Sequence, residues 1–479
     1  MKRRDFVKTA IAIPFAGAVV PTWLQASDKT EGILAFGHRG GKKMLYDNRQ
    51  RPQAVYLNGK IFIGYKGNSV SAVKANNGLR SGGGIAYTLL ISYDPKTRTF
   101  SEPVHLGEPT TDHHYCPIVW ADTAGHLHVL HGCHNSPGTH LISKKPGEMG
   151  QDESSGWIKT PDIAPSISYP TLFQVYDNRQ VLYYRTGGHT SSWSYQLSSD
   201  NGQTWKPRDK DVTDLDLVSH PDWSSYHCKV ISPDGRFLHV IFTDYDDNKA
   251  KEPRRFYNPR YKHAVDNEWK YNLSYVKIDL LTQEVLNERN EVLDTPVNYH
   301  TAREKCLIWD TDWRGAGVPP AVMLDENNNP AVLHVLSEQD IRTHSYYYVR
   351  KDNTGRWIQT PITASNHQWN SGYIRRDGTG HIHAYVIAGE GYLDLPGVNN
   401  THGGGRIEQW ISKDKGYTWT KFRDITPDTD QYAGMRYNNV QPVLRPDGSA
   451  VDGMLLFYGW KDEREPDGVA FLLDESKEI

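Results

Sequence analysis

Histidine, tyrosine and arginine recur in short clusters along this 479-residue chain, and these side chains can move protons and hold anions. Histidine titrates near neutral pH and can act as a general base, while tyrosine can give a proton to a leaving oxygen. Arginine stays charged and can hold a carboxylate with two parallel hydrogen bonds. The clusters are His113-His114-Tyr115, His131 with His134, Ser168-Tyr169, Arg185 with His189, Tyr226-His227, His367-Gln368-Trp369 and Arg436-Tyr437.

An internal repeat supplies the elements that would position these clusters. Its unit is a turn of Asp, Asn or Gly followed by a β-rich run, and an apolar run usually precedes the turn, which predicts a hairpin. Seven copies begin at Asn58, Asp122, Asp177, Asp234, Asp325, Asp377 and Asp447. This spacing suits four-stranded blades. We therefore expect an all-β, seven-bladed β-propeller of four-stranded antiparallel blades, with residues 27–479 forming a single domain.

Two segments, 199–205 and 412–419, resemble the Asp-box turn of sialidase-like propellers. In such a turn the Asp side chain bonds nearby backbone amides, Gly adopts a positive φ, and Trp packs beneath. Residues 32–36 are expected to add an outer strand that closes the ring with the last blade. Residues 244–270 form a long stretch that we expect to be irregular, and such loops are usually functional or separately anchored.

Hairpin geometry predicts where the clusters lie. The residues before the first strand and after the second strand of an antiparallel hairpin fall at the same edge. The innermost strands of a propeller all point the same way, so the seven edges should surround one mouth of the channel. The clusters of His, Tyr and Arg occupy these positions, whereas the turns at the opposite edge contain no comparable set of side chains. Propeller mouths are usually polar, so a merely solvated rim is the alternative.

The motifs around these positions resemble those of the ulvan lyases of polysaccharide lyase family 25. The resemblance rests on Asp112-His-His-Tyr-Cys-Pro117, His131-Gly-Cys-His-Asn135, Ser168-Tyr-Pro170 and Tyr184-Arg-Thr-Gly-Gly-His189, and it extends over most of the chain. It implies a seven-bladed propeller with a site formed by His114, His134, Tyr169 and Arg185, and a further tyrosine at Tyr226. It also implies cleavage of ulvan, a sulfated polymer of rhamnose 3-sulfate and uronic acid.

The implied reaction is β-elimination, which removes the C5 proton of a uronic acid and expels the group at C4. Arg185 would neutralise the carboxylate and stabilise the enolate-like transition state. His114 would be the base and Tyr169 the acid, although these two roles could be exchanged, and His134 could hold the carboxylate or orient His114. Further candidates for substrate binding are Tyr226, His189, Arg303, Trp369 and Tyr437. Trp369 and Tyr437 could stack on sugar rings or simply pack in the core.

Four side chains suit a structural zinc ion near the long stretch: His220, Asp222, Cys228 and His263. Their spacing fits no standard zinc finger, and the resemblance implies zinc in this region. No organic cofactor is expected. A disulfide between Cys116 and Cys133 is conceivable, with buried free thiols as the alternative.

Composition and charge limit the function and location of the protein. Hydrophobic residues make up 37% and aromatic residues 11%, which is typical of a folded globule. The net charge of -3 gives no indication of a nucleic-acid partner. Residues 1–26 resemble a twin-arginine signal peptide, with Arg3-Arg4 before an apolar run too short to span a bilayer. We expect a periplasmic or secreted protein without a membrane span, and a monomer.

Two other functions are compatible with such a propeller. A sialidase-like glycoside hydrolase would need paired carboxylates, or an arginine triad with a tyrosine nucleophile. A noncatalytic carbohydrate-binding propeller would keep aromatic rings but would have no use for a set of His, Tyr and Arg. The clusters are rich in histidine and poor in carboxylates, which favours the lyase.

Overall fold

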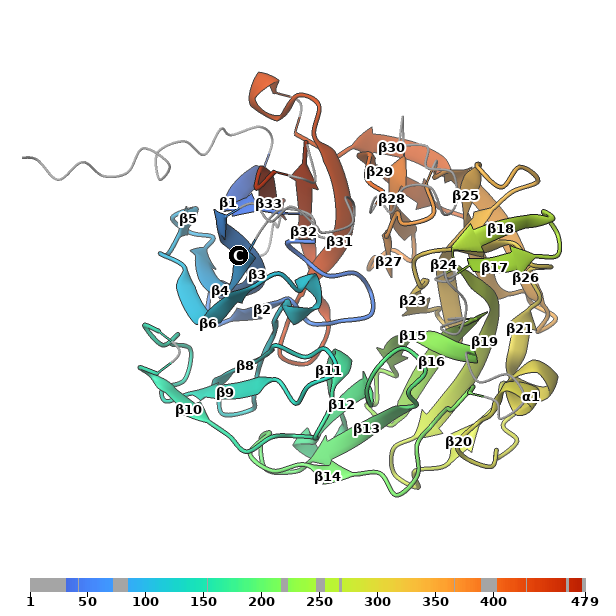
Figure 1. Ribbon diagram of the computed structural model, residues 1–479, viewed down its shortest axis with the longest axis horizontal. Coiled ribbons are helices and arrows are strands. Elements are labelled where there is room, and N and C mark those ends of the chain that lie inside the picture. The colour runs from blue at the N-terminus through green and yellow to red at the C-terminus, as the bar shows by residue number, and fades with distance from the viewer. Residues whose placement is uncertain are drawn as a thin grey trace, which may run out of the picture.

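The computed structural model describes residues 32–41, 43–71, 85–152, 154–216, 223–246, 255–266, 269–365, 367–388, 403–427, 429–461 and 465–475. Almost all regular structure in these ranges is β-strand, and the sheets follow one another around a common centre (Figure 1). The all-β expectation is confirmed. The helical elements are short: 3₁₀ turns at His113–Tyr115, Tyr176–Asn178 and Asp430–Tyr432, helix α1 (Tyr299–Thr301), and a π-helical turn at Ala302–Cys306.

The first and last strands share one nine-stranded sheet, ordered β1-β33-β32-β31-β2-β3-β4-β5, with β6 on β4. These strands are β1 (Ile33–Gly40), β2 (Ala54–Leu57), β3 (Lys60–Ser71), β4 (Ile85–Asp94), β5 (Thr99–Phe100), β6 (Val104–Thr110), β31 (Arg436–Leu444), β32 (Ala450–Trp460) and β33 (Gly468–Asp474). β1 pairs antiparallel with β33, with Ile33 opposite Leu473, so the expected closing strand is confirmed.

Four further sheets have four strands each. The first two contain β7 (Ile118–Ala121), β8 (Leu127–His131), β9 (Thr139–Ser143) and β10 (Trp157–Lys159), then β11 (Ser168–Gln174), β12 (Gln180–Arg185), β13 (Trp193–Ser198) and β14 (Lys206–Pro207). The other two contain β23 (Ala321–Leu324), β24 (Pro330–Ser337), β25 (His344–Lys351) and β26 (Trp357–Ala364), then β27 (Tyr373–Arg376), β28 (Ile382–Ala388), β29 (Arg406–Ser412) and β30 (Thr420–Asp424).

The region between these pairs of sheets departs from the expected pattern. A six-stranded sheet contains β15 (Trp223–Ile231), β16 (Phe237–Asp246), β19 (Lys270–Asp279), β20 (Val285–Leu286), β21 (Leu307–Trp309) and β22 (Gly315–Ala316). Both β21 and β22 add to the outer edge of β19. Residues 244–270 were expected to be irregular, but they contain a two-stranded antiparallel ribbon. It consists of β17 (Arg255–Asn258) and β18 (His263–Asp266), which pair through four consecutive residues.

Each of the seven repeat copies forms the expected antiparallel hairpin. The pairs are β2–β3, β7–β8, β11–β12, β15–β16, β23–β24, β27–β28 and β31–β32. The aspartate at the turn bonds the backbone in the expected way: Asp122 Oδ1 accepts from the amides of Ala124 and His126 at 2.9 and 2.8 Å. The side chain thus holds the turn that joins the two strands.

The two Asp-box turns also form as the sequence predicts. In the second, Asp414 Oδ1 accepts from the amide of Thr418 at 2.9 Å, and the amide of Gly416 donates to Ser412 Oγ at 2.7 Å. Gly416 has a φ of 85°, and a Cβ atom there would lie 2.1 Å from Cε1 of Tyr348. The glycine is therefore required both by its backbone conformation and by the neighbouring ring.

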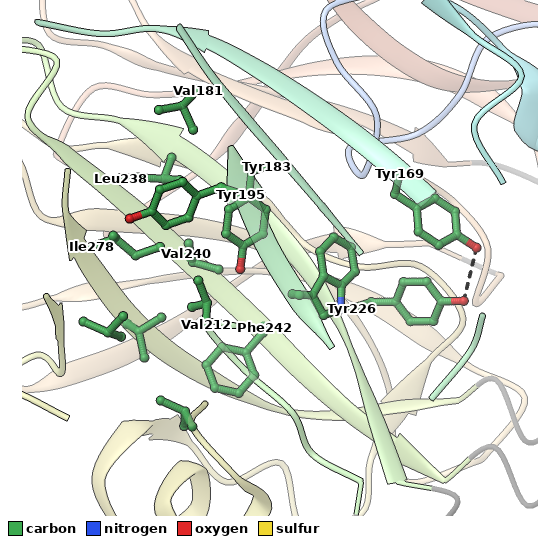
Figure 2. Packing of buried hydrophobic residues seen from close by; sticks show 14 of the residues in the cluster. Tyr169, Val181, Tyr183, Tyr195, Val212, Tyr226, Leu238, Val240, Phe242 and Ile278 are labelled. Atoms are coloured by element: carbon green, nitrogen blue, oxygen red, sulfur yellow. Dashed lines mark hydrogen bonds between the residues drawn. The ribbon is translucent and has the colours of Figure 1, made fainter. Parts of the chain in front are cut away.

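The core between the sheet β11–β14 and the sheet of β15 is built from aromatic and β-branched side chains. Figure 2 shows Val181, Tyr183, Tyr195, Val240 and their neighbours packed together. Tyr169 and Tyr226 belong to the same buried cluster, and Figure 2 shows their hydroxyl groups meeting at one end of it. Packing in this core therefore holds the rings of Tyr169 and Tyr226, two candidate site residues, in place.

All four cysteines are free and buried, so Cys116 and Cys133 do not form the disulfide that the sequence left conceivable. Within the described ranges, the helices are all too short or too polar to cross a bilayer.

Gly416→Ala should destabilise the protein more than Gly448→Ala. Both glycines have a φ above 80°, but a Cβ at Gly448 would meet nothing within 4 Å. The backbone strain, about 1 kcal/mol, is common to both, and the contact with Tyr348 should cost Gly416→Ala about 1–3 kcal/mol more. Urea unfolding measures both variants. Equal losses would contradict the role assigned to this turn.

Candidate functional site

Asp112 organises the first part of the site. It caps the short helix His113–Tyr115, and its side chain accepts from the amide of His114 at 2.9 Å. The capped turn stands directly before β7. It places the His114 ring close to His134, which follows β8. The motif therefore places two histidines, one before β7 and one after β8, on one carboxylate.

The same carboxylate holds both imidazole rings. Asp112 Oδ1 lies 2.6 Å from Nδ1 of His114, and Oδ2 lies 2.8 Å from Nδ1 of His134. Because an ionised carboxylate only accepts hydrogen bonds, both Nδ1 atoms carry the proton. The Nε2 lone pairs are then available to accept a proton, as a general base requires.

The two imidazoles stack face to face, with centroids 3.8 Å apart and planes 15° apart. His113 stacks on the other face of His114 at 4.0 Å. Burial lowers the pKa of His114 to about 3; Asp112 acts to raise it, while the proximity of His134 lowers it. The His114 side chain keeps 18% of its surface exposed, so a neutral imidazole remains accessible.

Tyr169 and Tyr226 form the centre of the site. Their hydroxyl groups face each other (Figure 2), with the two oxygens 3.3 Å apart. The Tyr169 ring lies 5.7 Å from the His114 ring. Tyr169 adopts a φ of 56°, and the register of β11 against β12 shifts between Ser168 and Thr171. A left-handed conformation is costly for a bulky residue, and such strain is concentrated at functional sites.

Arg185 supplies a buried positive charge beside the two tyrosines. It ends β12 and is 0% exposed, with Cζ 4.7 Å from the Tyr169 ring centroid and 5.3 Å from that of Tyr226. Nε donates to the Gly187 carbonyl at 3.2 Å. Nη1 and Nη2 meet no partner at full hydrogen-bond geometry among the residues that the structure describes, and Tyr226 is the side chain that interacts with this guanidinium. A buried guanidinium with two such donors suits an incoming carboxylate.

The charges around the tyrosine pair separate the pKa values of its two members. Burial raises the pKa of Tyr169 above its ordinary value, and Tyr226 raises it further. Burial acts in the same direction on Tyr226, but Arg185, His189, Arg49 and Lys270 together hold its pKa below the ordinary value. Tyr226 is therefore the member that ionises first, and Tyr169 keeps its proton.

Sequence reasoning missed several residues at this site. Arg49 lies between β1 and β2, with Cζ 4.8 Å from the Tyr169 ring and 4.7 Å from the Tyr226 ring, and it pairs with Asp47. Lys270, at the start of β19, lies 4.5 Å from the Tyr226 ring. The hairpin rule, applied to the residues before β2, would have found Arg49. Lys270 lies on β19, the third strand of its sheet, and the hairpin rule covers only the first two strands.

The structure places the other predicted substrate-binding residues differently. His189 is close enough to Tyr226 to lower its pKa. Trp369 is 5% exposed, and Lys270 Nζ lies 5.0 Å from its ring centroid, so it borders the site. Arg303 pairs with Asp310 at 3.3 Å and stays a prediction. Tyr437 is 3% exposed and packs against Phe457 and Phe471, which favours the packing alternative, and its role in sugar stacking stays a prediction.

The zinc prediction stays a prediction. His220 and Asp222 lie outside the described residues. Cys228 sits in a hydrophobic cluster with Ile241 and Leu273, and His263 is exposed at the start of β18. Within the described ranges, the group of possible metal ligands that the geometry brings together is Asp112, His114 and His134. In that group the Nδ1 atoms of both histidines are hydrogen-bonded to the Asp112 carboxylate, so these atoms are already engaged.

The comparisons with known proteins agree with this fold. A family model described as "BNR repeat-containing family member" matches residues 84–365, more than half of the chain. The chain belongs to this BNR repeat family. A curated ulvan lyase of Nonlabens ulvanivorans is 24% identical over 327 residues, which is 61% of each chain. An ulvan lyase of Alteromonas sp. (strain LOR) is 24% identical over 55% of this chain and 53% of its own.

Solved structures show the same fold. A structure of a family 25 ulvan lyase bound to -[GlcA(1-4)Rha3S]- superposes with a TM-score of 0.70 at 17% identity, covering 92% of this chain and 96% of the other. The polysaccharide lyase Uly1 superposes with a TM-score of 0.58 at 12% identity, covering 95% of both chains. The resemblance found from the motifs is thus confirmed. The sequence matches span about three fifths or less of the curated relatives' length.

His114 should remain neutral well below the usual histidine range. Because burial lowers its pKa from 6.5 to about 3, the imidazole should bind no proton between pH 7 and pH 5. Nuclear magnetic resonance titration of the ring, assigned with His114→Gln, measures this directly. Protonation with a midpoint near 6.5 would contradict the described environment.

Proposed function

We propose that this protein is an ulvan lyase, which cleaves the sulfated rhamnose–uronic acid polymer by β-elimination at the C4–O bond of the uronic acid. The observation that carries the proposal is Arg185. Its buried guanidinium faces two tyrosines and has two donor nitrogens that meet no partner at full hydrogen-bond geometry in the described structure. The stacked rings of His114 and His134 lie 5.7 and 6.1 Å from the Tyr169 ring. A carboxylate bound at Arg185 would thus have a base and an acid beside it.

The elimination needs three tasks from these residues. Arg185 holds the uronate carboxylate and neutralises the charge that grows on it as the C5 proton leaves. The electron pair of the C5–H bond forms the C4–C5 double bond while the C4–O bond breaks. The leaving oxygen takes up a proton, so the products are an unsaturated uronate and a free hydroxyl group.

His114 and Tyr169 are proposed for the two proton transfers. The Nδ1 proton of His114 is held by Asp112, which leaves Nε2 free to accept the C5 proton. Tyr169 keeps its own proton beside Tyr226 and can give it to the leaving oxygen. His134 shares Asp112 and stacks on His114, so its proposed role is to fix the orientation of the base.

The hydrolase alternative is less compatible with the geometry. A glycoside hydrolase needs two carboxyl groups beside the substrate. In the described part of the site, the carboxylate of Asp112 bonds two imidazoles, and that of Asp47 bonds Arg49 at 2.6 and 2.8 Å. Neither is free to act as nucleophile or acid. A purely binding propeller would not explain the strained Tyr169 or the free donors of Arg185.

The finer features of the chain are part of the same proposal. The seven hairpins support seven blades in one domain spanning residues 27–479, with β1 and β33 closing the ring. Residues 1–26 are proposed as a twin-arginine signal that delivers the protein to the periplasm or the medium. A zinc ion near the ribbon β17–β18 would have a structural role, and metal analysis of the purified protein tests it.

Tyr169→Phe and Arg185→Lys should both fold and lose turnover of ulvan. The first removes the proposed acid, and the second replaces a planar two-donor group by a point charge. We expect losses of about 10²-fold or more in kcat for each. The measurement is the absorbance of the unsaturated uronate during digestion. Tyr195→Phe is the matched control, because Tyr195 belongs to the same buried cluster but its hydroxyl lies apart from the pair (Figure 2). Full activity in both site variants would contradict the assignment.

Asp112→Asn should lower kcat about 10-fold to 100-fold while leaving KM nearly unchanged. The amide can accept from one imidazole but presents a donor to the other, so one ring must change its tautomer or turn. The loss should not be rescued by raising the pH. A variant that recovers at high pH would indicate that Asp112 acts through charge alone.

A further inference from the structure

The segment that joins β1 to β2 reaches the middle of the molecule (Figure 1). Its polar side chains are buried, with Asp47, Arg49 and Gln50 exposed by 3% or less. Its backbone is bonded to separate sheets: the Leu45 carbonyl accepts from Asn439 Nδ2 of β31 at 2.8 Å, and the Arg51 amide donates to the Pro170 carbonyl of β11 at 3.2 Å. The segment is therefore held firmly across the centre.

Arg49 is the most constrained residue of this segment. Its carbonyl accepts from Thr171 Oγ1 at 3.0 Å and from Lys229 Nζ at 3.2 Å. Its guanidinium donates through Nε and Nη2 to the two oxygens of Asp47, at 2.8 and 2.6 Å. The backbone carbonyl and the guanidinium edge of Arg49 are thus both held by hydrogen bonds. The flat face of the guanidinium remains for contact with aromatic rings.

Three tyrosine rings surround that guanidinium. Arg49 Cζ lies 5.2, 4.8 and 4.7 Å from the ring centroids of Tyr46, Tyr169 and Tyr226. Arg185 lies over the same two rings, of Tyr169 and Tyr226, so two guanidinium groups flank one pair of tyrosines. A cation over an aromatic ring fixes the ring and favours negative charge on its oxygen.

We propose that Arg49, held by Asp47, is a positioning residue of the site: it keeps the rings of Tyr169 and Tyr226 in place and stabilises negative charge on their hydroxyl pair when a proton leaves. The inference rests on the proposed function for its catalytic meaning, because Tyr169 gives up a proton during elimination. The other charged or titratable groups near the pair are Arg185, Lys270, His189 and the stacked histidines, together with Tyr46.

Removal of Arg49 should shift the titration of the tyrosine pair without substrate present. In Arg49→Gln, phenolate absorbance of the pair should appear at a pH about one unit higher than in the unchanged protein, because a nearby cation is lost. Arg49→Lys should keep most of the effect. Asp47→Asn combined with Arg49→Gln avoids an unpaired buried carboxylate and guards against unfolding. Tyr226→Phe assigns the absorbance to the pair.

Arg350→Gln is the matched control, because Arg350 is also buried and stacks on a tyrosine, with Cζ 4.0 Å from the Tyr417 ring. It should leave the pair's titration unchanged. On ulvan, the tyrosine-controlled limb of the kcat profile should move up by the same amount in Arg49→Gln, with kcat reduced about tenfold or more.

The outcomes separate the two proposals. An unshifted titration in folded Arg49→Gln and in the double variant overturns the role of Arg49, even when ulvan is cleaved. A shifted titration in a protein that cleaves no uronate polymer upholds the positioning role and rejects the lyase.

Discussion

The site depends on a positive charge buried where the described residues offer it no carboxylate. Placing a guanidinium out of water is costly unless its donors are satisfied. Arg185 meets one carbonyl and two phenol rings, while its remaining donors meet no partner at full hydrogen-bond geometry in the described structure. An anion would satisfy those donors, so in the proposed function this buried charge is the group that binds the carboxylate of an acidic sugar.

Each of the other groups takes its place relative to that charge. The hairpins bring Tyr169 of β11 and Arg185 of β12 to one edge, together with His114, which precedes β7, and His134, which follows β8. Asp112 accepts from Nδ1 of both imidazoles and so fixes the orientation of the two rings. The cations lower the pKa of Tyr226, whereas burial and the proximity of Tyr226 raise the pKa of Tyr169. The proposed base, acid and anion site therefore all belong to one connected cluster of side chains.

Much of this could be read from the sequence, because hairpin repeats determine which residues share an edge. That rule found the imidazoles, Tyr169, Tyr226 and Arg185. It could not show that Asp112 bridges two rings, since a carboxylate's partners depend on rotamers. It was not applied to the segment before β2, so Arg49 was missed, and it does not cover Lys270 on β19. Tyr437 lay at the right edge but faces Phe457 and Phe471, because position along a strand does not reveal the packing around a ring.

The most direct test of the central claim is a crystal structure of the Tyr169→Phe variant with a bound ulvan tetrasaccharide. The account predicts that a uronate carboxylate lies within hydrogen-bond distance of both Nη atoms of Arg185, with its C5 atom facing His114. An oligosaccharide bound elsewhere on the protein, with the Arg185 donors still open, would contradict it.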